Sequence, residues 1–350
     1  MASLNIPLAL FICFSVSLAS VFVLSRLAFK IDLLDSPDHR KNHDGHVPLV
    51  GGISIFLGVA SSFLFFPVLG QEMTALIIAA ILIVAIGLLD DHLDIKVRYR
   101  LFMQFMAAIV ITIGGGMMIE TLGVFGTGRV FELGIFSLPF TIFSIMVAIN
   151  AFNFLDGIDG LTGLMFMIAI LAIITMCGSA AISNVSFHII PLAFLAAIIP
   201  YMASNLGLLG KQNRVFLGDA GSMLLGLVVA WLLIRYTQGS GKFFSPVTGL
   251  WIIAIPLMDM LAIVTRRSRN GKAPFEPDRN HLHHLFMDRG MSDRKALIVI
   301  GSLSIVFAAI GVLSELYAVS QLTMLIAFLV IFFGYYQLVA HFENQKPVQV

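Results

Sequence analysis

Long apolar runs separated by short polar breaks make up most of this chain. Runs of about 17 to 25 apolar residues are long enough to cross a bilayer as single helices. They predict about eleven transmembrane helices, at residues 4–28, 49–69, 73–89, 101–118, 137–154, 160–179, 186–204, 219–237, 246–265, 296–314 and 319–340. The pattern therefore predicts an all-α, polytopic integral membrane protein with a single membrane-embedded domain over residues 1–350.

One polar stretch, Asn150-Ala-Phe-Asn-Phe-Leu-Asp-Gly-Ile-Asp-Gly160, interrupts this pattern at the end of an apolar run. At 100° per residue, Asn150, Asn153 and Asp156 share one helical face. Asp159 would lie opposite Asn150, unless the glycines of the stretch break the helix. Carboxylates at the edge of a membrane helix usually mark a functional site, although a plain connecting loop is the alternative. We predict a helix that breaks in this stretch.

Composition agrees with a membrane protein. Hydrophobic residues make up 59% of the chain, charged residues 12%, and the mean hydropathy is +0.97. These values exclude an ordinary soluble protein. The two cysteines, Cys13 and Cys177, lie in different apolar runs, so we expect no disulfide framework. The first apolar run lacks a basic start and is too long for a signal peptide, so it is predicted to be a retained helix.

The distribution of basic residues predicts the orientation. Of the 21 Lys and Arg residues, only Arg129, Arg235 and Lys242 fall on one side of the predicted spans. Loops rich in Lys and Arg stay in the cytoplasm, so the N-terminus is predicted to be periplasmic and the C-terminus cytoplasmic. The polar clusters all fall in the cytoplasmic loops. An enzyme whose active site faces the cytoplasm at the membrane surface fits this distribution.

Two of these clusters are rich in aspartate. Asp90-Asp91-His-Leu-Asp94 follows an apolar run, and in a helix Asp90 and Asp94 would share a face. Carboxylates that close repel unless a cation lies between them, and Mg²⁺ prefers such oxygens. The alternative is a solvated helix end whose counter-ions are Lys96, Arg98 and Arg100.

The second aspartate cluster, Phe216-Leu-Gly-Asp219-Ala-Gly-Ser222, precedes another apolar run. Its glycines suggest that another group approaches the backbone closely here, and its backbone amides are suited to binding an anion. Asp219 is also an ordinary helix N-cap, which is the alternative.

The remaining clusters are cationic. A basic loop from Arg266 leads to three histidines within four residues, at His281, His283 and His284. Imidazoles beside several arginines suit recognition of a diphosphate, with a zinc site as an alternative. A second basic loop contains Lys41, for which a juxtamembrane basic stretch is the alternative reading. Carboxylates for a metal, cations for phosphates and a membrane edge together point to phosphoryl transfer involving a lipid.

At this point the chain resembles the polyprenyl-phosphate N-acetylhexosamine-1-phosphate transferases. Four motifs carry the resemblance in the family's order: Asp90-Asp91-His-Leu-Asp94, Asn150 to Gly160, Phe216-Leu-Gly-Asp219, and Pro277-Asp-Arg-Asn-His281-Leu-His283-His284. The last motif looks like the branch that uses UDP-N-acetylglucosamine to start O-antigen, enterobacterial common antigen or teichoic acid linkage units. The resemblance implies that undecaprenyl phosphate attacks the UDP-sugar and that UMP leaves.

The resemblance also implies roles for single residues. Asp219, Asp94 and Asp91 are expected at a Mg²⁺ ion, with Mn²⁺ as an alternative metal. Asp90, Asp91, Asn153 and Asp156 are expected to be catalytic. The expected substrate contacts are Lys41, Asp159, Phe216, Arg266, Arg267, His281, His283 and His284, with Phe216 stacking on uracil.

Several alternatives stay open at this level. Asp90 is either a base for the lipid phosphate or a carboxylate of the metal site, and a base is hardly needed because a phosphate monoester is largely a dianion at neutral pH. Another UDP-N-acetylhexosamine would give the same reaction. A secondary transporter and an intramembrane aspartyl protease are the readings from other classes. The bilayer is an expected partner, a homodimer is an alternative to a monomer, and no nucleic acid is expected.

Overall fold

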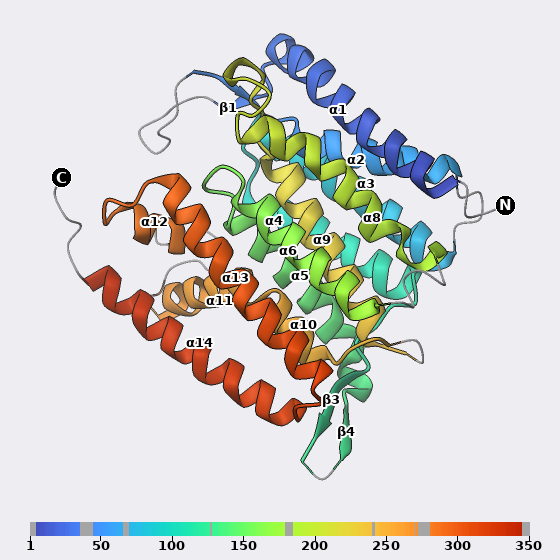
Figure 1. Ribbon diagram of the computed structural model, residues 1–350, viewed down its shortest axis with the longest axis vertical. Coiled ribbons are helices and arrows are strands. Elements are labelled where there is room, and N and C mark those ends of the chain that lie inside the picture. Colours follow the sequence, from blue (N-terminus) through green and yellow to red (C-terminus); the bar gives the residue numbers. More distant parts are fainter. Residues whose placement is uncertain are drawn as a thin grey trace. The chain divides into compact units, whose positions relative to one another are not determined.

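The computed structural model describes residues 5–35, 45–65, 70–126, 128–178, 185–239, 242–269, 271 and 281–344. The chain forms two compact units, one from Met1–Gly116 and Gly178–Val228, the other from Met117–Cys177 and Val229–Val350. Helices make up most of both units (Figure 1). The predicted helical class is therefore confirmed, and two short strand pairs that the sequence did not predict accompany the helices.

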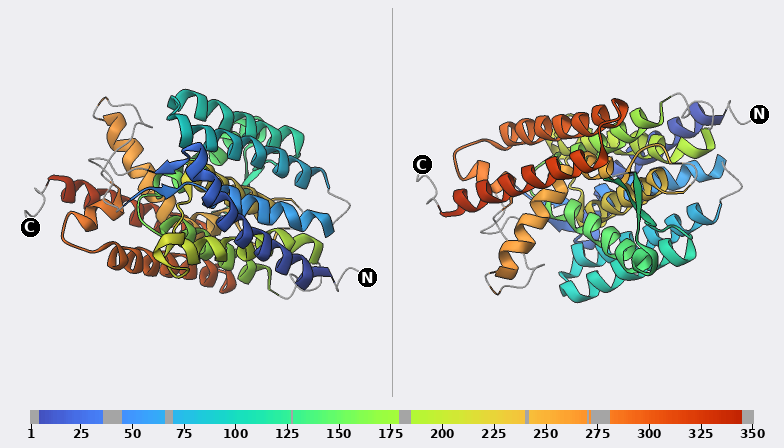
Figure 2. Two further views of the ribbon diagram at one scale, coloured as in Figure 1. Left: turned by 90° about the horizontal axis from the view of Figure 1, so that it is seen from above. Right: turned by 90° about the horizontal axis from the view of Figure 1, so that it is seen from below.

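The first unit is built from helices and one very short antiparallel strand pair. Its helices are α1 (Asn5–Ile31), α2 (Gly51–Ser62), α3 (Gln71–Leu93), α4 (Val97–Ile109), α8 (Val185–Asn205) and the start of α9 (Gly218–Thr237). A π-helical turn, Val110–Gly114, extends α4. Strand β1 (Leu34–Asp35) pairs with β2 (Val47–Pro48). Helices α1, α2 and α8 pack on one another, as the blue and yellow-green ribbons of Figure 2 show.

The second unit begins with a hairpin of β3 (Thr121–Phe125) and β4 (Arg129–Glu132). Its helices are α5 (Ser137–Phe154), α6 (Leu161–Cys177), the end of α9, α10 (Pro246–Ile252), α11 (Ala254–Arg269), α12 (Leu282–Met287), α13 (Asp293–Leu316) and α14 (Gln321–Asn344). Helix α13 packs against α6, α10 and α11, and α11 packs against α5. These contacts join segments that are far apart in the sequence.

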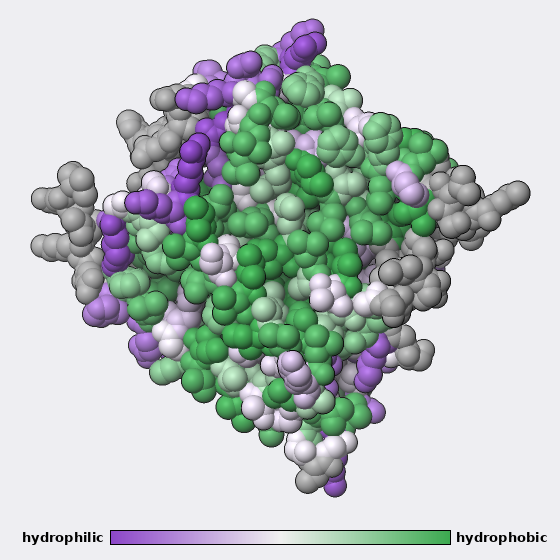
Figure 3. Space-filling model, viewed as in Figure 1, coloured by the Kyte–Doolittle hydropathy of each residue, from purple (hydrophilic) through white to green (hydrophobic). Residues whose placement is uncertain are grey.

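Among the described residues, seven helices are long and apolar enough to cross a membrane. Hydrophobic side chains cover most of the face in Figure 3, as expected for surfaces in contact with lipid. The protein is thus a polytopic membrane protein. Each of the eleven predicted segments contains a helix, but α2, α6 and the apolar part of α8 are shorter than a usual span. The number eleven stays a prediction.

The segment predicted as one span at 246–265 is instead broken. Helices α10 and α11 meet at Ile253 with a bend of 83°. Pro256 explains where the second helix begins, because proline has no N–H to donate and is tolerated in the first turn of a helix. The prediction of a continuous helix here was wrong.

Glycines let three helices of the first unit approach closely. A Cβ atom on Gly87 of α3 would lie 2.2 Å from the Cα atom of Ala220, at the start of α9. A Cβ atom on Gly52 of α2 would lie 2.2 Å from the backbone nitrogen of Gly221. Such separations exclude any side chain. The start of α9, which carries Asp219, is therefore held between α2 and α3.

We expect Gly87→Ala to prevent normal folding, because the added methyl group would force α3 and α9 apart. The yield of monodisperse protein in detergent and its melting temperature measure this effect. Gly334→Ala is the matched control: it is also helical, and nothing lies within 4 Å of its Cβ position. Equal melting temperatures for the two variants would contradict this packing.

Candidate active site

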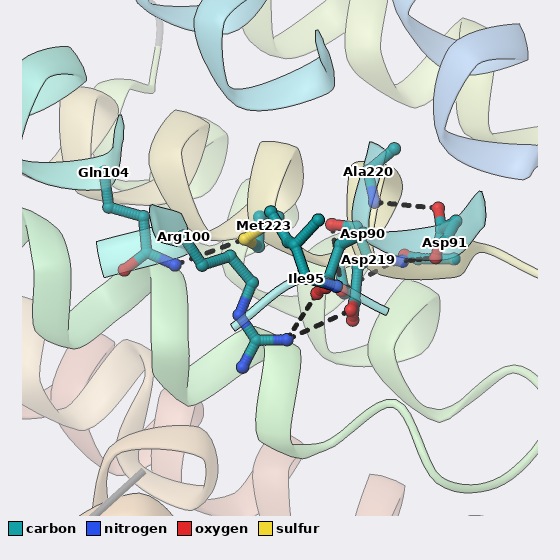
Figure 4. A network of polar contacts seen from close by, with 10 residues as sticks. Asp90, Asp91, Ile95, Arg100, Gln104, Asp219, Ala220 and Met223 are labelled. Carbon is teal, nitrogen blue, oxygen red and sulfur yellow. Dashed lines mark hydrogen bonds and ion pairs between the residues drawn. The ribbon is translucent and has the colours of Figure 1, made fainter. Parts of the chain in front are cut away.

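Two groups of polar side chains stand out, one in each unit. The first, here called the carboxylate cluster, consists of Asp90, Asp91, Arg100 and Asp219 (Figure 4). Arg100 Nη1 donates to Asp90 Oδ2 at 2.5 Å and to Asp219 Oδ2 at 3.2 Å. The other oxygen of Asp90 accepts from the backbone N–H of Ile95 at 3.0 Å. One guanidinium therefore joins the end of α3 to the start of α9.

Asp91 points at the backbone of α9 rather than at Arg100 (Figure 4). Its carboxylate accepts from the N–H groups of Asp219 at 2.7 Å and of Ala220 at 3.3 Å. Gly218 has φ +72°, and a Cβ atom there would lie 2.5 Å from Asp91 Oδ2. The expected close approach at this glycine is thus to Asp91, whose carboxylate is the anion held by the amides of the helix start.

The segment before Asp219 is fixed from its other side as well. The carbonyl oxygens of Phe216 and Leu217 accept from the first two N–H groups of α2 at 2.9 and 3.0 Å. The guanidinium of Arg214 lies over the Phe216 ring, 5.3 Å from its centroid. Backbone hydrogen bonds and a cation–π contact therefore hold the ring that the resemblance assigns to uracil.

Asp94 does not share a helical face with Asp90. It is the C-cap of α3, in a left-handed conformation with φ 46°, and its side chain is exposed. Aspartate adopts this conformation more readily than most residues. The assumption of a continuous helix through Asp94 was wrong, and its role at a metal stays a prediction.

The donor set suits a Mg²⁺ ion that arrives with a phosphate substrate. Mg²⁺ is usually held by one or two carboxylates plus phosphate oxygens and water. Asp90 and Asp219 already converge on one cationic nitrogen, and the Asp219 side chain is 31% exposed. Among the described residues, no three His, Cys, Asp or Glu side chains form a metal-binding group on their own. The two carboxylates therefore fit a shared ion rather than a closed protein cage.

In the second unit, the stretch Asn150–Gly160 breaks the helix as predicted. Helix α5 ends at Phe154, α6 begins at Leu161, and Gly160 has φ +75°. Asp156 lies in the turn and is exposed, so placing it on one helical face with Asn150 and Asn153 was wrong. Asn150 is buried and donates to the Met146 carbonyl oxygen at 2.8 Å, which ties it to its own helix.

The three histidines, here called the histidine cluster, pack on this turn. The His281 ring meets the Phe154 ring edge-on at 5.6 Å. His283 Nε2 lies 2.0 Å from where a Cβ atom on Gly157 would be. The centroids of the His283 and His284 rings are 4.2 Å apart. The structure thus brings together two predicted motifs that lie more than a hundred residues apart.

The histidine cluster is anchored by a residue that the sequence analysis missed. Asp259 of α11, 1% exposed, contacts His281 Nδ1 at 3.1 Å and accepts from the Leu282 N–H at 3.1 Å. The Tyr335 hydroxyl of α14 donates to the same carboxylate at 2.7 Å. A charged residue inside an apolar run was the available signal for Asp259.

The other predicted contacts are less defined. Arg266 and Arg267 lie in the last turn of α11, where Arg267 is buried and Arg266 half-buried. Asp159 is half-buried in the turn before α6. Lys41 and the segment 272–280 lie outside the described residues.

His283 is neutral in the folded protein. Burial, together with the charges of the neighbouring His284 and His281, lowers its pKa to about 3. Within the described part of the chain, neither ring nitrogen has a hydrogen-bond partner. In the unfolded chain this imidazole binds a proton below its ordinary pKa of about 6.5, whereas in the folded protein it does not. The free energy of unfolding therefore falls as the pH decreases from about 6.5 toward 3.

We therefore expect the wild-type protein to lose about 2 kcal/mol more stability than His283→Leu between pH 8 and pH 5. Melting temperatures in detergent at the two pH values give the comparison. His92→Leu, which replaces an exposed histidine, should keep the wild-type difference. The same pH dependence in His283→Leu and in the wild type would show that His283 is not held neutral.

Comparison with known proteins identifies a family to which this chain is similar. Residues 73–237 match the model of the glycosyl transferase family described as "Glycosyl transferase family 4". This range contains both aspartate motifs and the turn after α5.

Relatives with a stated activity match most of the chain. The undecaprenyl-phosphate alpha-N-acetylglucosaminyl 1-phosphate transferase of Yersinia pestis is 42% identical, covering 92% of this chain and 88% of the relative. The Escherichia coli K12 protein of the same name is 41% identical over 90% and 86%. The Haemophilus influenzae protein of that name is 38% identical over 95% and 94%.

Proposed function

The chain belongs to glycosyl transferase family 4, together with the undecaprenyl-phosphate alpha-N-acetylglucosaminyl 1-phosphate transferases, and from this we propose its reaction. It transfers N-acetylglucosamine 1-phosphate from UDP-N-acetylglucosamine to undecaprenyl phosphate. The products are undecaprenyl-diphospho-N-acetylglucosamine and UMP. This would be the first step of lipid-linked polysaccharide synthesis of the O-antigen or enterobacterial common antigen type.

The observation that carries the proposal is the identity of 38% to 42% with these enzymes over at least nine-tenths of the chain. The two polar clusters support it. Paired carboxylates with an arginine suit a metal-bound phosphate, and histidines beside a helix-breaking turn suit a diphosphate.

In this reaction an oxygen of the lipid phosphate attacks the β-phosphorus of the UDP-sugar. The bond from the β-phosphorus to the oxygen that bridges it to the α-phosphorus breaks, and UMP leaves with that electron pair. Positioning and charge neutralisation supply most of the catalysis in such transfers. Phe216 would stack on uracil and Asp159 would contact the uridine, while Asn153, Asp156 and the histidine cluster would hold the diphosphate. Lys41, Arg266 and Arg267 would add positive charge.

Asp90 and Asp219 would hold a Mg²⁺ ion, with Asp94 as a further candidate ligand and Mn²⁺ as an alternative metal. The ion would neutralise charge on the diphosphate. Asp91, which the resemblance also places at the metal, would instead act by fixing the backbone that carries Asp219. Arg100 would hold the two carboxylates in place before the substrate arrives.

The ion pair of Asp90 favours one of its two candidate roles. Its carboxylate is already engaged by Arg100 and the Ile95 N–H, which suits a charged anchor better than a base. We therefore expect Asp90→Asn to lose the same fraction of kcat at pH 6 and at pH 8. A base would be needed more at pH 6, where the lipid phosphate carries a proton more often. Initial rates at both pH values, compared with the wild type, give the answer.

For the membrane arrangement, we propose a multi-pass protein of the bacterial inner membrane with a single catalytic domain over residues 1–350. About eleven membrane segments, a periplasmic N-terminus and a cytoplasmic C-terminus would place the site at the cytoplasmic face. The strong asymmetry of Lys and Arg supports this orientation. A homodimer is an alternative to a monomer that cross-linking in membranes would reveal.

The test of the proposed function is release of UMP by the purified protein. UMP should form from UDP-N-acetylglucosamine only when both undecaprenyl phosphate and Mg²⁺ are added. A panel of UDP-N-acetylhexosamines in the same assay measures the choice of sugar. If UMP forms without the lipid phosphate, or not at all, the proposed reaction is wrong.

A further inference from the structure

The hydrogen bonds around Asp259 define the state of one histidine. Asp259 Oδ1 accepts from both the Leu282 N–H and the Tyr335 hydroxyl, at 3.1 and 2.7 Å. Asp259 Oδ2 faces His281 Nδ1 at 3.1 Å. An ionised carboxylate only accepts hydrogen bonds, so Nδ1 of His281 carries the proton. The other ring nitrogen, Nε2, points away from Asp259.

The network joins three helices of the second unit, α11, α12 and α14, coloured orange to red in Figure 1. Asp259 and His281 are 1% and 8% exposed. Edge-on contact with Phe154 and stacking on the His283 ring restrict the plane of the His281 ring. The ring is therefore fixed in position, in plane and in the atom that carries its proton.

We propose that Asp259 and Tyr335 are positioning residues that hold His281 as a hydrogen-bond donor, through Nε2, to an anionic oxygen of the sugar-nucleotide diphosphate. This inference rests on the proposed function. With Nδ1–H directed at Asp259, His281 donates through Nε2 only as the imidazolium, whose charge would lie opposite the Asp259 carboxylate. His281 thus offers the diphosphate a charge-assisted hydrogen bond.

Asp259→Asn tests this with little change in shape. The amide oxygen is retained at the Oδ1 position, because the Leu282 N–H and the Tyr335 hydroxyl both need an acceptor there. The NH₂ group then faces His281 and donates to Nδ1. This removes the proton from Nδ1 and leaves a neutral ring. The neutral ring carries its remaining hydrogen on Nε2 and still donates, so the variant loses the charge of the donor and not the hydrogen bond itself. We expect kcat/KM for UDP-N-acetylglucosamine to fall about 5- to 30-fold, the difference between a charged and a neutral donor.

Tyr335→Phe removes one of the three donors to the carboxylate, so a smaller fall of about 3- to 10-fold is expected. Tyr336→Phe is the matched control. It removes the hydroxyl of the adjacent residue, which accepts from Arg269 at 3.0 Å in an exposed contact and does not touch Asp259 within the described residues. We expect its kcat/KM to equal that of the wild type.

A double variant separates positioning from plain structural support. If Asp259 acts through His281, Asp259→Asn should have almost no further effect on kcat/KM in a His281→Gln background. An additive loss in the double variant would overturn the proposal, and so would wild-type kcat/KM in Asp259→Asn.

Nitrogen NMR of the His281 ring gives a readout that does not depend on activity. Nδ1 should be protonated in the wild type and unprotonated in Asp259→Asn. A protonated Nδ1 in both proteins would overturn the proposal. A wild-type protein that releases no UMP would instead contradict the proposed function, and the NMR result would still decide the state of His281.

Discussion

Asp219→Asn should lower kcat on the order of 10³-fold while leaving the protein folded, a loss of about 4 kcal/mol of transition-state stabilisation. Asparagine keeps the shape of the side chain and removes its charge. The backbone of Asp219 is held by the Asp91 carboxylate and does not depend on the Asp219 side chain. The substitution therefore removes a ligand charge without moving the helix start.

The measurement is the initial rate of UMP release at saturating substrates, over a range of Mg²⁺ concentrations. A metal ligand predicts a higher Mg²⁺ requirement as well as a lower maximal rate. Asp293→Asn, an exposed aspartate at the start of α13, should leave both values unchanged. More than a tenth of the wild-type kcat in Asp219→Asn, with the usual Mg²⁺ requirement, would exclude Asp219 as a ligand.

Asp94→Asn in the same assay tests the sequence prediction that Asp94 binds the metal. The side chain is exposed and the backbone is left-handed, a conformation that asparagine also adopts. We expect a loss of less than tenfold. A loss as large as that of Asp219→Asn would restore Asp94 to the metal site.

The sequence identifies the charged residues that end apolar runs, because such residues are conspicuous there. Asp90, Asp91 and Asp219 were found in this way. The sequence could not show that Asp91 turns toward the start of α9, since that depends on Gly52 and Gly87 allowing three helices to meet. A contact between residues 128 positions apart is decided by packing, not by local pattern.

The helical periodicity of α4 indicates that the side chain of Arg100 points inward. In the sequence, Arg100 stands beside Lys96 and Arg98 as one of three possible counter-ions. Arg100 lies one turn before Gln104, which is fully buried, and the same face of α4 continues to Ala107 and Ala108. Because the following turns of this helix face are buried, Arg100 is expected to point into the protein. Arg98 lies on another face of α4 and is exposed.

The break in the 246–265 segment was missed for a different reason. Hydropathy alone does not distinguish one straight helix from two short helices with the same composition. Pro256 was visible in the sequence, but a proline inside a membrane helix is often tolerated. Its place as a first-turn residue follows from the bend at Ile253, which the sequence does not specify.

The ion pairs of Arg100 lead to the second large effect that we expect. The Asp90 side chain is 4% exposed and that of Arg100 15%, so the pair is largely shielded from water. Arg100→Met would leave the buried Asp90 carboxyl beside Asp219 without its counter-charge, and removal of one partner of such a pair typically costs about 3 to 5 kcal/mol. We therefore expect a fall of several degrees in melting temperature, measured with EDTA so that no bound metal replaces the arginine. Arg98→Met, which loses an exposed hydrogen bond and a cation–π contact with the neighbouring Tyr99, should melt like the wild type. Addition of Asp90→Asn to Arg100→Met should restore much of the lost stability, because the carboxyl that lost its partner is then replaced by a neutral amide. A further fall in melting temperature in the double variant would show that the ion pair does not stabilise the fold in this way.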